Sequence, residues 1–219
     1  LGHFYSAMTG FLGFAMLDGE YKMMGLAPYG SPDYLPFIRQ NILLTDAPGS
    51  YRLHGDLLDY HAALKKQFHP KLLEAFGSPR LSDDAPFTER HRQIAASAQA
   101  AFEEVVGDMA SWAFQQGGKR TNVAIAGGCG LNCSANGKLL RDGPFTRMYV
   151  PPAPHDAGCA VGAALLLHHE RLGKPRQFEM THAYYGPAYG EQDIGRALCA
   201  LGLEARPMAD EEALLQRAV

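Results

Sequence analysis

The sequence VAIAGGCGLNCSANGKLL, residues 123–140, combines three local signals in a fixed order. A short apolar run ends abruptly at Gly127 and Gly128, which is typical of a strand followed by a tight loop. Asn132 and Ser134 come next, and both residue types are favoured as helix N-caps. The stretch therefore predicts a strand, a glycine loop and a helix.

The following segment repeats this alternation of strand and helix. A β-rich run at residues 146–150 ends at Pro151 and Pro152, and a new helix is expected from about Ala157. Two strands joined by one helix lie parallel through a right-handed crossover, so the loops that follow them meet at one edge of the sheet. The sequence thus predicts an α/β fold in which these two loops are neighbours.

This shared edge is a candidate ligand site, because open α/β sheets bind ligands at the carboxyl ends of their strands. Backbone N–H groups after Gly127 and Gly128 suit a phosphate, and Asp156 could hold the divalent cation of a nucleotide. Alternatively, the glycines serve only a tight turn and Asp156 caps the next helix. The residues alone leave both interpretations open.

Four blocks of sequence resemble one known family. They are YSAMTGFLGF (residues 5–14), EYKMMGLAPYG (20–30), GGCGLNCSANGKLLRDGPF (127–145) and PPAPHDAGCAVGAALLL (151–167), in the family's order. Together they resemble the carbamoyltransferase family that includes NodU-type nodulation proteins and CmcH-type O-carbamoyltransferases of antibiotic biosynthesis. Ordered blocks of this kind are far more specific than a single glycine loop.

The resemblance implies a fold and a domain order. Residues 1–172 are expected to form the C-terminal part of a TsaD-like domain of the ASKHA superfamily, the actin-like ATPase and ribonuclease H-like fold. Residues 31–88 would be a helical insertion. Residues 173–219 would contain a linker and the start of a truncated YrdC-like domain.

The resemblance also implies a reaction and its ligands. ATP and carbamoyl phosphate would form a carbamoyl-adenylate, whose carbamoyl group passes to a hydroxyl of a small metabolite. Gly127, Gly128 and Asn132 would line the nucleotide, and Asp156 would bind a divalent metal, iron or magnesium. The family's metal-binding HxxxH motif is expected before residue 1 and does not occur in this sequence. The chain alone is therefore expected to be a fragment without activity.

Lys22 and His155 are the two candidate catalytic residues. Lys22 is the one cation of a predicted helix over residues 20–27, and an ammonium beside a phosphate or carbamoyl oxygen would stabilise developing charge. Alternatively it is solvated or pairs with Glu20. His155 lies next to Asp156 and could instead serve only to shape the loop.

Composition limits the remaining classes of function. The net charge of −3 gives no basis for a nucleic-acid surface, and the apolar run at residues 157–167 is too short to span a bilayer. The 4 cysteines form no CxxC pair, which agrees with a cytoplasmic protein.

Two other functions remain as alternatives to carbamoyl transfer. One is an ASKHA-fold kinase or ATPase, and the other is a non-catalytic nucleotide-binding module. Assembly as a homo-oligomer is left open.

Several further helices are predicted from periodicity. The longest covers residues 88–116, and its apolar stripe, which includes Ile94, Met109 and Trp112, is expected to be part of the core. Others cover residues 2–13, 56–68, 191–201 and 210–218. The helix from Ala157 is rich in small residues, and its far end, 165–167, is expected to be buried.

Overall fold

The computed structural model describes residues 1–54, 57–58 and 68–218. The helix predicted over residues 56–68 falls almost wholly outside these ranges. The chain forms two compact units, Leu1–Arg176 and Gln177–Val219, which are described separately.

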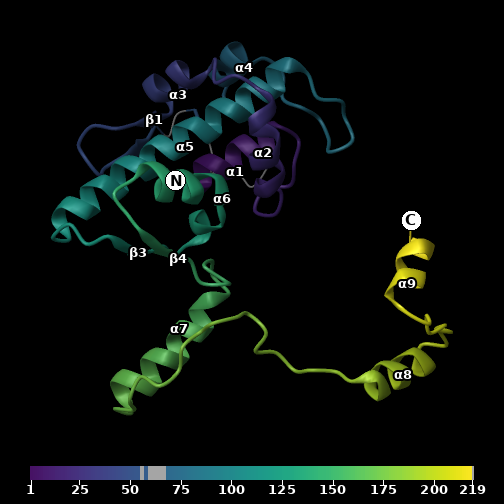
Figure 1. The fold of residues 1–219 in the computed structure, drawn as a ribbon. Coiled ribbons are helices and arrows are strands. Elements are labelled where there is room, and N and C mark those ends of the chain that lie inside the picture. The colour runs from purple at the N-terminus through teal and green to yellow at the C-terminus, as the bar shows by residue number, and fades with distance from the viewer. Residues whose placement is uncertain (55–56, 59–67, 219) are drawn as a thin grey trace. The chain divides into compact units, whose positions relative to one another are not determined.

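The first unit is mainly helical, with two small sheets (Figure 1). Its elements are α1 (Gly2–Phe11), α2 (Glu20–Leu26), η1 (Ala27–Tyr29), α3 (Leu35–Asn41), β1 (Leu43–Leu44), β2 (Arg52–Leu53), α4 (Pro70–Phe76), α5 (Glu89–Gln116), β3 (Asn122–Ala124), η2 (Gly128–Leu131), α6 (Cys133–Asp142), β4 (Arg147–Tyr149), α7 (Gly158–Leu166) and η3 (Leu167–Arg171). The second unit contains α8 (Glu191–Ala200) and α9 (Glu211–Ala218).

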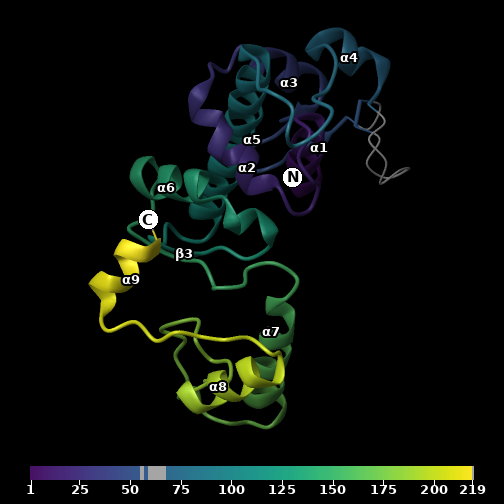
Figure 2. The same cartoon turned by 90° about the vertical axis from the view of Figure 1, so that its right-hand side faces the viewer.

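Helix α5 is the central element of the first unit and confirms the long helix predicted there. It contacts α1, α2, α3 and α6, and Figures 1 and 2 both show these helices grouped around it. The helix begins with a capping box: the Thr88 N–H donates to Nδ1 of His91 at 3.2 Å, and the His91 N–H donates to Oγ1 of Thr88 at 3.4 Å. Two backbone N–H groups are thereby satisfied where the helix starts.

Helix α1 is buried on both of its faces. Phe4 and Met8 on the apolar face have no exposed surface, while Ser6 and Thr9 on the opposite face are also buried. Thr9 donates to the carbonyl of Tyr5 at 2.9 Å, and Ser6 donates to the Glu20 carboxylate. The small polar face is therefore filled by packing and by internal hydrogen bonds.

The described residues between 31 and 88 contribute to the same core as α1 and α5. Ile38 and Leu72 are fully buried, and the rings of Phe11 and Phe76 meet edge to face at 5.7 Å between centroids. Strands β1 and β2 of this part of the chain pair antiparallel, with Leu43 opposite Leu53. This part of the chain therefore helps to hold α1 and α5 in place.

The predicted burial of Met109 and Trp112 is wrong, since their exposed fractions are 39% and 47%. A helix of 28 residues is about 42 Å long, and the last turns of α5 extend past the core. Trp112 instead covers Gly49, where an added Cβ would collide with the indole ring. The apolar stripe identified the face of the helix but not the extent of the core.

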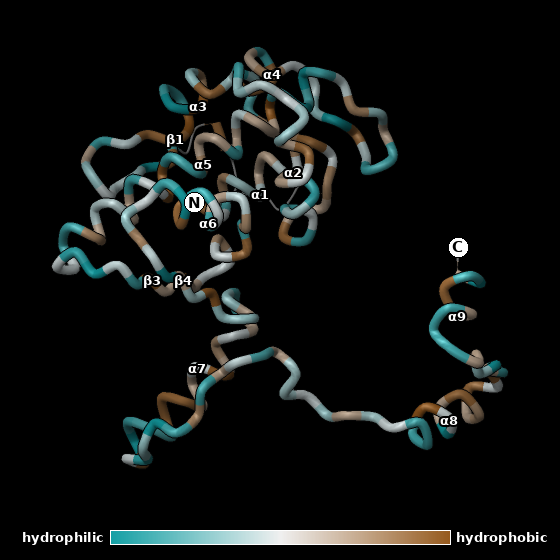
Figure 3. The backbone as a smooth tube through the Cα atoms, in the orientation of Figure 1, coloured by the Kyte–Doolittle hydropathy of each residue, from teal (hydrophilic) through white to brown (hydrophobic). Residues whose placement is uncertain are grey.

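Helix α7 also differs from expectation, because none of its residues is buried and Leu166 and Leu167 are each 54% exposed. Brown, apolar segments mark α7 in Figure 3. A helix that is apolar on all sides is normally covered by other elements. Among the described elements, α7 has extensive contacts only with η3, which directly continues it, and so no other element covers it.

The remaining elements agree with the sequence. Strands β3 and β4 are parallel, with Val123 opposite Met148, as the strand–helix–strand order predicts. In the second unit, α8 and α9 occupy the two predicted positions, and the Gly190 N–H donates to Asp193 at the start of α8 at 3.0 Å. No helix in the described part of the chain is long and apolar enough to cross a membrane.

Candidate functional site

The two predicted loops lie side by side at the carboxyl edge of the β3–β4 pair. The Gly127 N–H donates to the carbonyl of Pro154 at 2.7 Å, which joins the glycine loop directly to the loop that carries His155 and Asp156. The ladder continues one residue past β3, since the Ile125 N–H donates to Tyr149 at 2.9 Å. The predicted adjacency of the loops is confirmed.

The glycine loop has the backbone geometry that its sequence indicates. Gly127 has φ +97°, a region that favours glycine, and a Cβ added at Gly128 would meet nothing within 4 Å. Among the described residues, no acceptor takes the Gly128 N–H. Gly130 is different, because its added Cβ would lie 3.4 Å from Pro154. The loop therefore packs on its neighbour at Gly130 and leaves Gly128 accessible.

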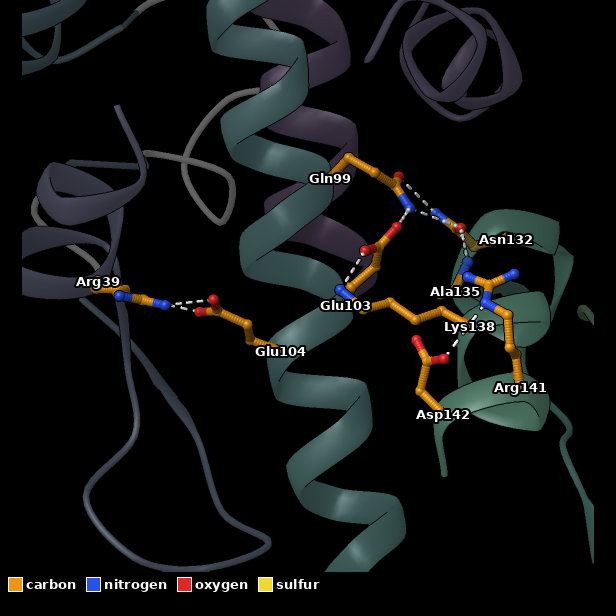
Figure 4. A network of polar contacts seen from close by, with 9 residues as sticks. All are labelled: Arg39, Gln99, Glu103, Glu104, Asn132, Ala135, Lys138, Arg141 and Asp142. Carbon is orange, nitrogen blue, oxygen red and sulfur yellow. Dashed lines mark hydrogen bonds and ion pairs between the residues drawn. The ribbon is translucent and has the colours of Figure 1, made fainter. Parts of the chain in front are cut away.

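Asn132 ends the glycine loop and caps α6. Its Oδ1 accepts from the Ala135 N–H at 2.9 Å, and the side chain is only 7% exposed. The amides of Asn132 and Gln99 of α5 are paired by two reciprocal hydrogen bonds of 3.0 Å (Figure 4). Sequence reasoning did not identify Gln99; the available signal was a polar residue within the alanine-rich part of the helix.

His155 and Asp156 are both exposed at the second loop. Nδ1 of His155 accepts the Ala157 N–H at 3.3 Å, so His155, rather than Asp156, bonds the backbone ahead of α7. In the described part of the chain, no side chain bonds to the Asp156 carboxylate, and no group of three or more His, Cys, Asp or Glu residues could hold a metal ion. Asp156 can thus supply one metal ligand, and further ligands would have to come from elsewhere.

Lys22 lies on α2 and makes an ion pair with Asp83, not with Glu20. Its ammonium is also 5.9 Å from the centre of the Phe14 ring. The hydrogen bond to Asp83 raises the pKa of Lys22, which keeps the side chain cationic. Helix α2 touches the start of α6 through the sulfur atoms of Met24 and Cys133, 3.8 Å apart. Asp83, which is 61 residues from Lys22 in sequence, was not identified from the pattern.

A cavity of about 420 Å³ lies elsewhere, between α5 and the segment that follows α3. Its walls include Leu43, Asp46, Val105 and Asp108, and none of the predicted site residues lines it. At its rim, Nε of Arg39 donates to Glu104 at 2.7 Å (Figure 4). The predicted site is therefore the exposed loop edge and not this cavity.

The parallel strands with a glycine loop at their carboxyl edge define an α/β protein with an accessible edge site. Residues 1–165 match the family described as carbamoyltransferase N-terminus. The chain belongs to this carbamoyltransferase family.

Curated relatives include nodulation proteins. The chain is 41% identical over 194 residues to nodulation protein NolO of Bradyrhizobium diazoefficiens, which covers 88% of this chain and 32% of that protein. It is 38% identical over 206 residues to nodulation protein NolNO of Sinorhizobium fredii, covering 92% and 28%. An uncharacterized protein of Synechocystis sp. is 41% identical over 198 residues, covering 89% and 32%. The chain spans about a third of the length of these relatives.

Proposed function

We propose that this chain provides the nucleotide-binding part of a cytoplasmic, ATP-dependent O-carbamoyltransferase of the ASKHA fold. The protein would use carbamoyl phosphate, through a carbamoyl-adenylate, to carbamoylate a hydroxyl group of a small metabolite. Family membership supports carbamoyl transfer, and the hydroxyl acceptor is the one that the sequence resemblance implies.

One observation carries the proposal: the 2.7 Å hydrogen bond from Gly127 to Pro154. Because of this bond, the accessible Gly128 N–H and the Asp156 carboxylate belong to two directly connected loops. A nucleotide with its cation needs both an N–H donor for phosphate and an oxygen ligand for the metal. We assign Gly127, Gly128 and Asn132 to the nucleotide loop and Asp156 to the metal.

The residues present are suited to bind a nucleotide, but they supply only one ligand for a metal ion. Gly128 has open space where a Cβ would stand, so a phosphate can approach the backbone there. Asp156 offers a single carboxylate, and the phosphates of the nucleotide and residues outside this chain would complete the coordination. A bound divalent metal would supply neutralisation of phosphate charge. His155 fixes the backbone beside Asp156, and Lys22 would contribute a cation close to the transferred group.

The decisive experiment follows the products of ATP in the full-length protein. With ATP, carbamoyl phosphate and a divalent metal, we expect ATP to give AMP and pyrophosphate only when carbamoyl phosphate is present, and the phosphate group of carbamoyl phosphate to be released as inorganic phosphate. Release of ADP and phosphate would instead select a kinase or ATPase, and absence of any turnover would contradict the proposal. The same assay on the 219-residue chain alone should give no transfer.

A matched variant tests the metal assignment. Asp156→Asn removes one negative charge at an exposed position and should raise the metal concentration that gives half-maximal activity by about tenfold. Asp142→Asn, at an exposed carboxylate near the end of α6, is the control and should leave that concentration unchanged. If the two variants need the same metal concentration for half-maximal activity, Asp156 is not a metal ligand.

A further inference from the structure

The side chain of Gln99 uses all of its hydrogen-bonding capacity inside the protein. Figure 4 shows its bonds to Glu103 and Asn132. Its Oε1 accepts from the Tyr5 hydroxyl at 2.6 Å and from Nδ2 of Asn132 at 3.0 Å. Its Nε2 donates to Oε1 of Glu103 at 2.8 Å and to Oδ1 of Asn132 at 3.0 Å. Tyr5, Gln99 and Asn132 are each no more than 7% exposed, so the network lies in the interior.

Glu103 sets the orientation of the two amide groups in this network. A carboxylate can only accept, so the NH₂ group of Gln99 must face Glu103, and Nζ of Lys138 holds the other carboxylate oxygen at 3.0 Å. This fixes the orientation of the Gln99 amide, which in turn fixes that of the Asn132 amide. Oδ1 of Asn132 then faces the Ala135 N–H, as a helix N-cap requires.

An amide rotated by half a turn at Asn132 would place its NH₂ group against the Ala135 N–H, donor facing donor. Both polar atoms of the Asn132 side chain are already paired with Gln99 and Ala135. Asn132 can therefore affect a ligand by holding the glycine loop and the first turn of α6, without contacting the ligand itself.

We propose that Gln99 is a positioning residue that orders the glycine loop and the start of α6 for the nucleotide, acting through Asn132. The consequence for ATP rests on the proposed function, whereas the ordering of the loop does not. Loss of the Gln99 amide removes the hydrogen bonds that it accepts from Nδ2 of Asn132 and from the Tyr5 hydroxyl in the interior. The loop would then sample other orientations before binding ATP and would bind it more weakly.

The test compares Gln99→Met with Ser97→Ala in the full-length protein. Methionine keeps the length of the side chain and removes its polarity. Ser97 is a matched control, since it is fully buried on the same helix but accepts from the Tyr34 N–H at 2.9 Å, away from the loop. Thermal unfolding of both variants measures the general loss of stability that any buried polar deletion causes.

The first readout is hydrogen exchange of the backbone amides of residues 128–136, without ligand. We expect exchange to accelerate about tenfold in Gln99→Met beyond the change in Ser97→Ala, the scale of one buried hydrogen bond. The second readout is the Kd for ATP, which should rise about tenfold in Gln99→Met alone, with KM for carbamoyl phosphate unchanged. Unchanged exchange, or an unchanged Kd for ATP, would overturn the positioning role.

A double-mutant cycle tests the route of the effect. Asn132→Ser keeps a good N-cap but loses the pair with Gln99. In that background, Gln99→Met should weaken ATP binding no further, because the contact that it acts through is already absent. An additive effect would overturn action through Asn132. If the unmodified protein does not bind ATP, the nucleotide assignment fails, and hydrogen exchange still decides whether Gln99 orders the loop.

Discussion

The Cζ atom of Arg80 lies 3.9 Å from the centre of the Phe87 ring, and it lies 5.2 Å from that of Phe14. Arg80 is only 4% exposed, and its guanidinium donates to the carbonyl of Leu12 at 3.0 Å and to that of Ala85 at 2.7 Å. One buried side chain therefore ties the segment before α5 to the end of α1. It also donates to the carbonyl of Asp83, the residue that pairs with Lys22.

Replacing Arg80 should destabilise the protein strongly. Arg80→Met removes the donor to the buried carbonyl of Leu12 and to the partly buried carbonyls of Ala85 and Asp83, and it also removes the stacked cation, so we expect a loss of about 3 kcal/mol. The free energy of unfolding in urea measures this loss. Arg92→Met is the control, because Arg92 makes an exposed ion pair with Glu89 on one face of α5. That variant should change stability by less than about 0.5 kcal/mol, and equal losses in the two variants would contradict the role of Arg80.

Gly127 and Gly128 can be compared to separate backbone strain from the space that a ligand needs. Gly127→Ala forces a Cβ onto a residue with φ +97° and should cost about 1–2 kcal/mol of stability. At Gly128 there is open space, so Gly128→Ala should stay within about 0.5 kcal/mol of the unmodified protein.

ATP binding separates the two glycine variants further. We expect Gly128→Ala to raise the Kd for ATP about tenfold, because the methyl group occupies the space into which a phosphate would enter. Calorimetric titration of the full-length protein measures the Kd. Normal affinity in a stably folded Gly128→Ala variant would show that no phosphate comes close to this residue.

The parts of the site that could be predicted are those set by neighbouring residues. The glycines, the cap at Asn132 and the two strands follow from local signals within residues 123–150, and the parallel pairing follows from the strand–helix–strand order. The Gln99–Asn132 pair joins residues 33 apart, and the Lys22–Asp83 pair joins residues 61 apart. Such contacts depend on how helices pack, which periodicity does not specify.

The wrong predictions share a physical origin. Periodicity shows which side chains of a helix are apolar, but it does not show what covers them. Trp112 lies beyond the end of the core, and Leu166 and Leu167 remain exposed on α7 and η3. By contrast, the predicted core face of α5 is correct where other helices pack on it, at Ile94, for example.

His91 should make stability depend on pH. Burial, and then the positive charges of Arg90 and its neighbours, lower the pKa of His91, so the folded state favours the neutral ring. Its Nδ1 accepts the Thr88 N–H, which a protonated ring could not do. The unfolded chain binds a proton near pH 6.5, so stability should fall as the pH drops below about 6.5 toward the lower pKa of the folded state.

The control for His91 is His91→Gln, since glutamine is a usual partner in a capping box and does not titrate. Free energies of unfolding measured between pH 7.5 and pH 5 should decline less steeply for His91→Gln than for the unmodified protein. Other titrating groups contribute equally to both proteins. Parallel pH profiles would mean that His91 does not lose its proton affinity on folding.

Variants of Lys22 and Asp83 test whether Lys22 takes part in catalysis or only forms a surface ion pair. The side chains are 38% and 48% exposed, so breaking the pair should change the unfolding midpoint very little. If the Lys22 ammonium stabilises charge on the transferred group, Lys22→Met should lower kcat about a hundredfold. Asp83→Asn keeps the ammonium and frees it from its partner, so kcat should stay within about threefold of the unmodified value. Steady-state carbamoyl transfer by the full-length protein measures both variants. Because the two changes break the same ion pair, similar kcat values for them would assign Lys22 to the surface contact and remove it from catalysis.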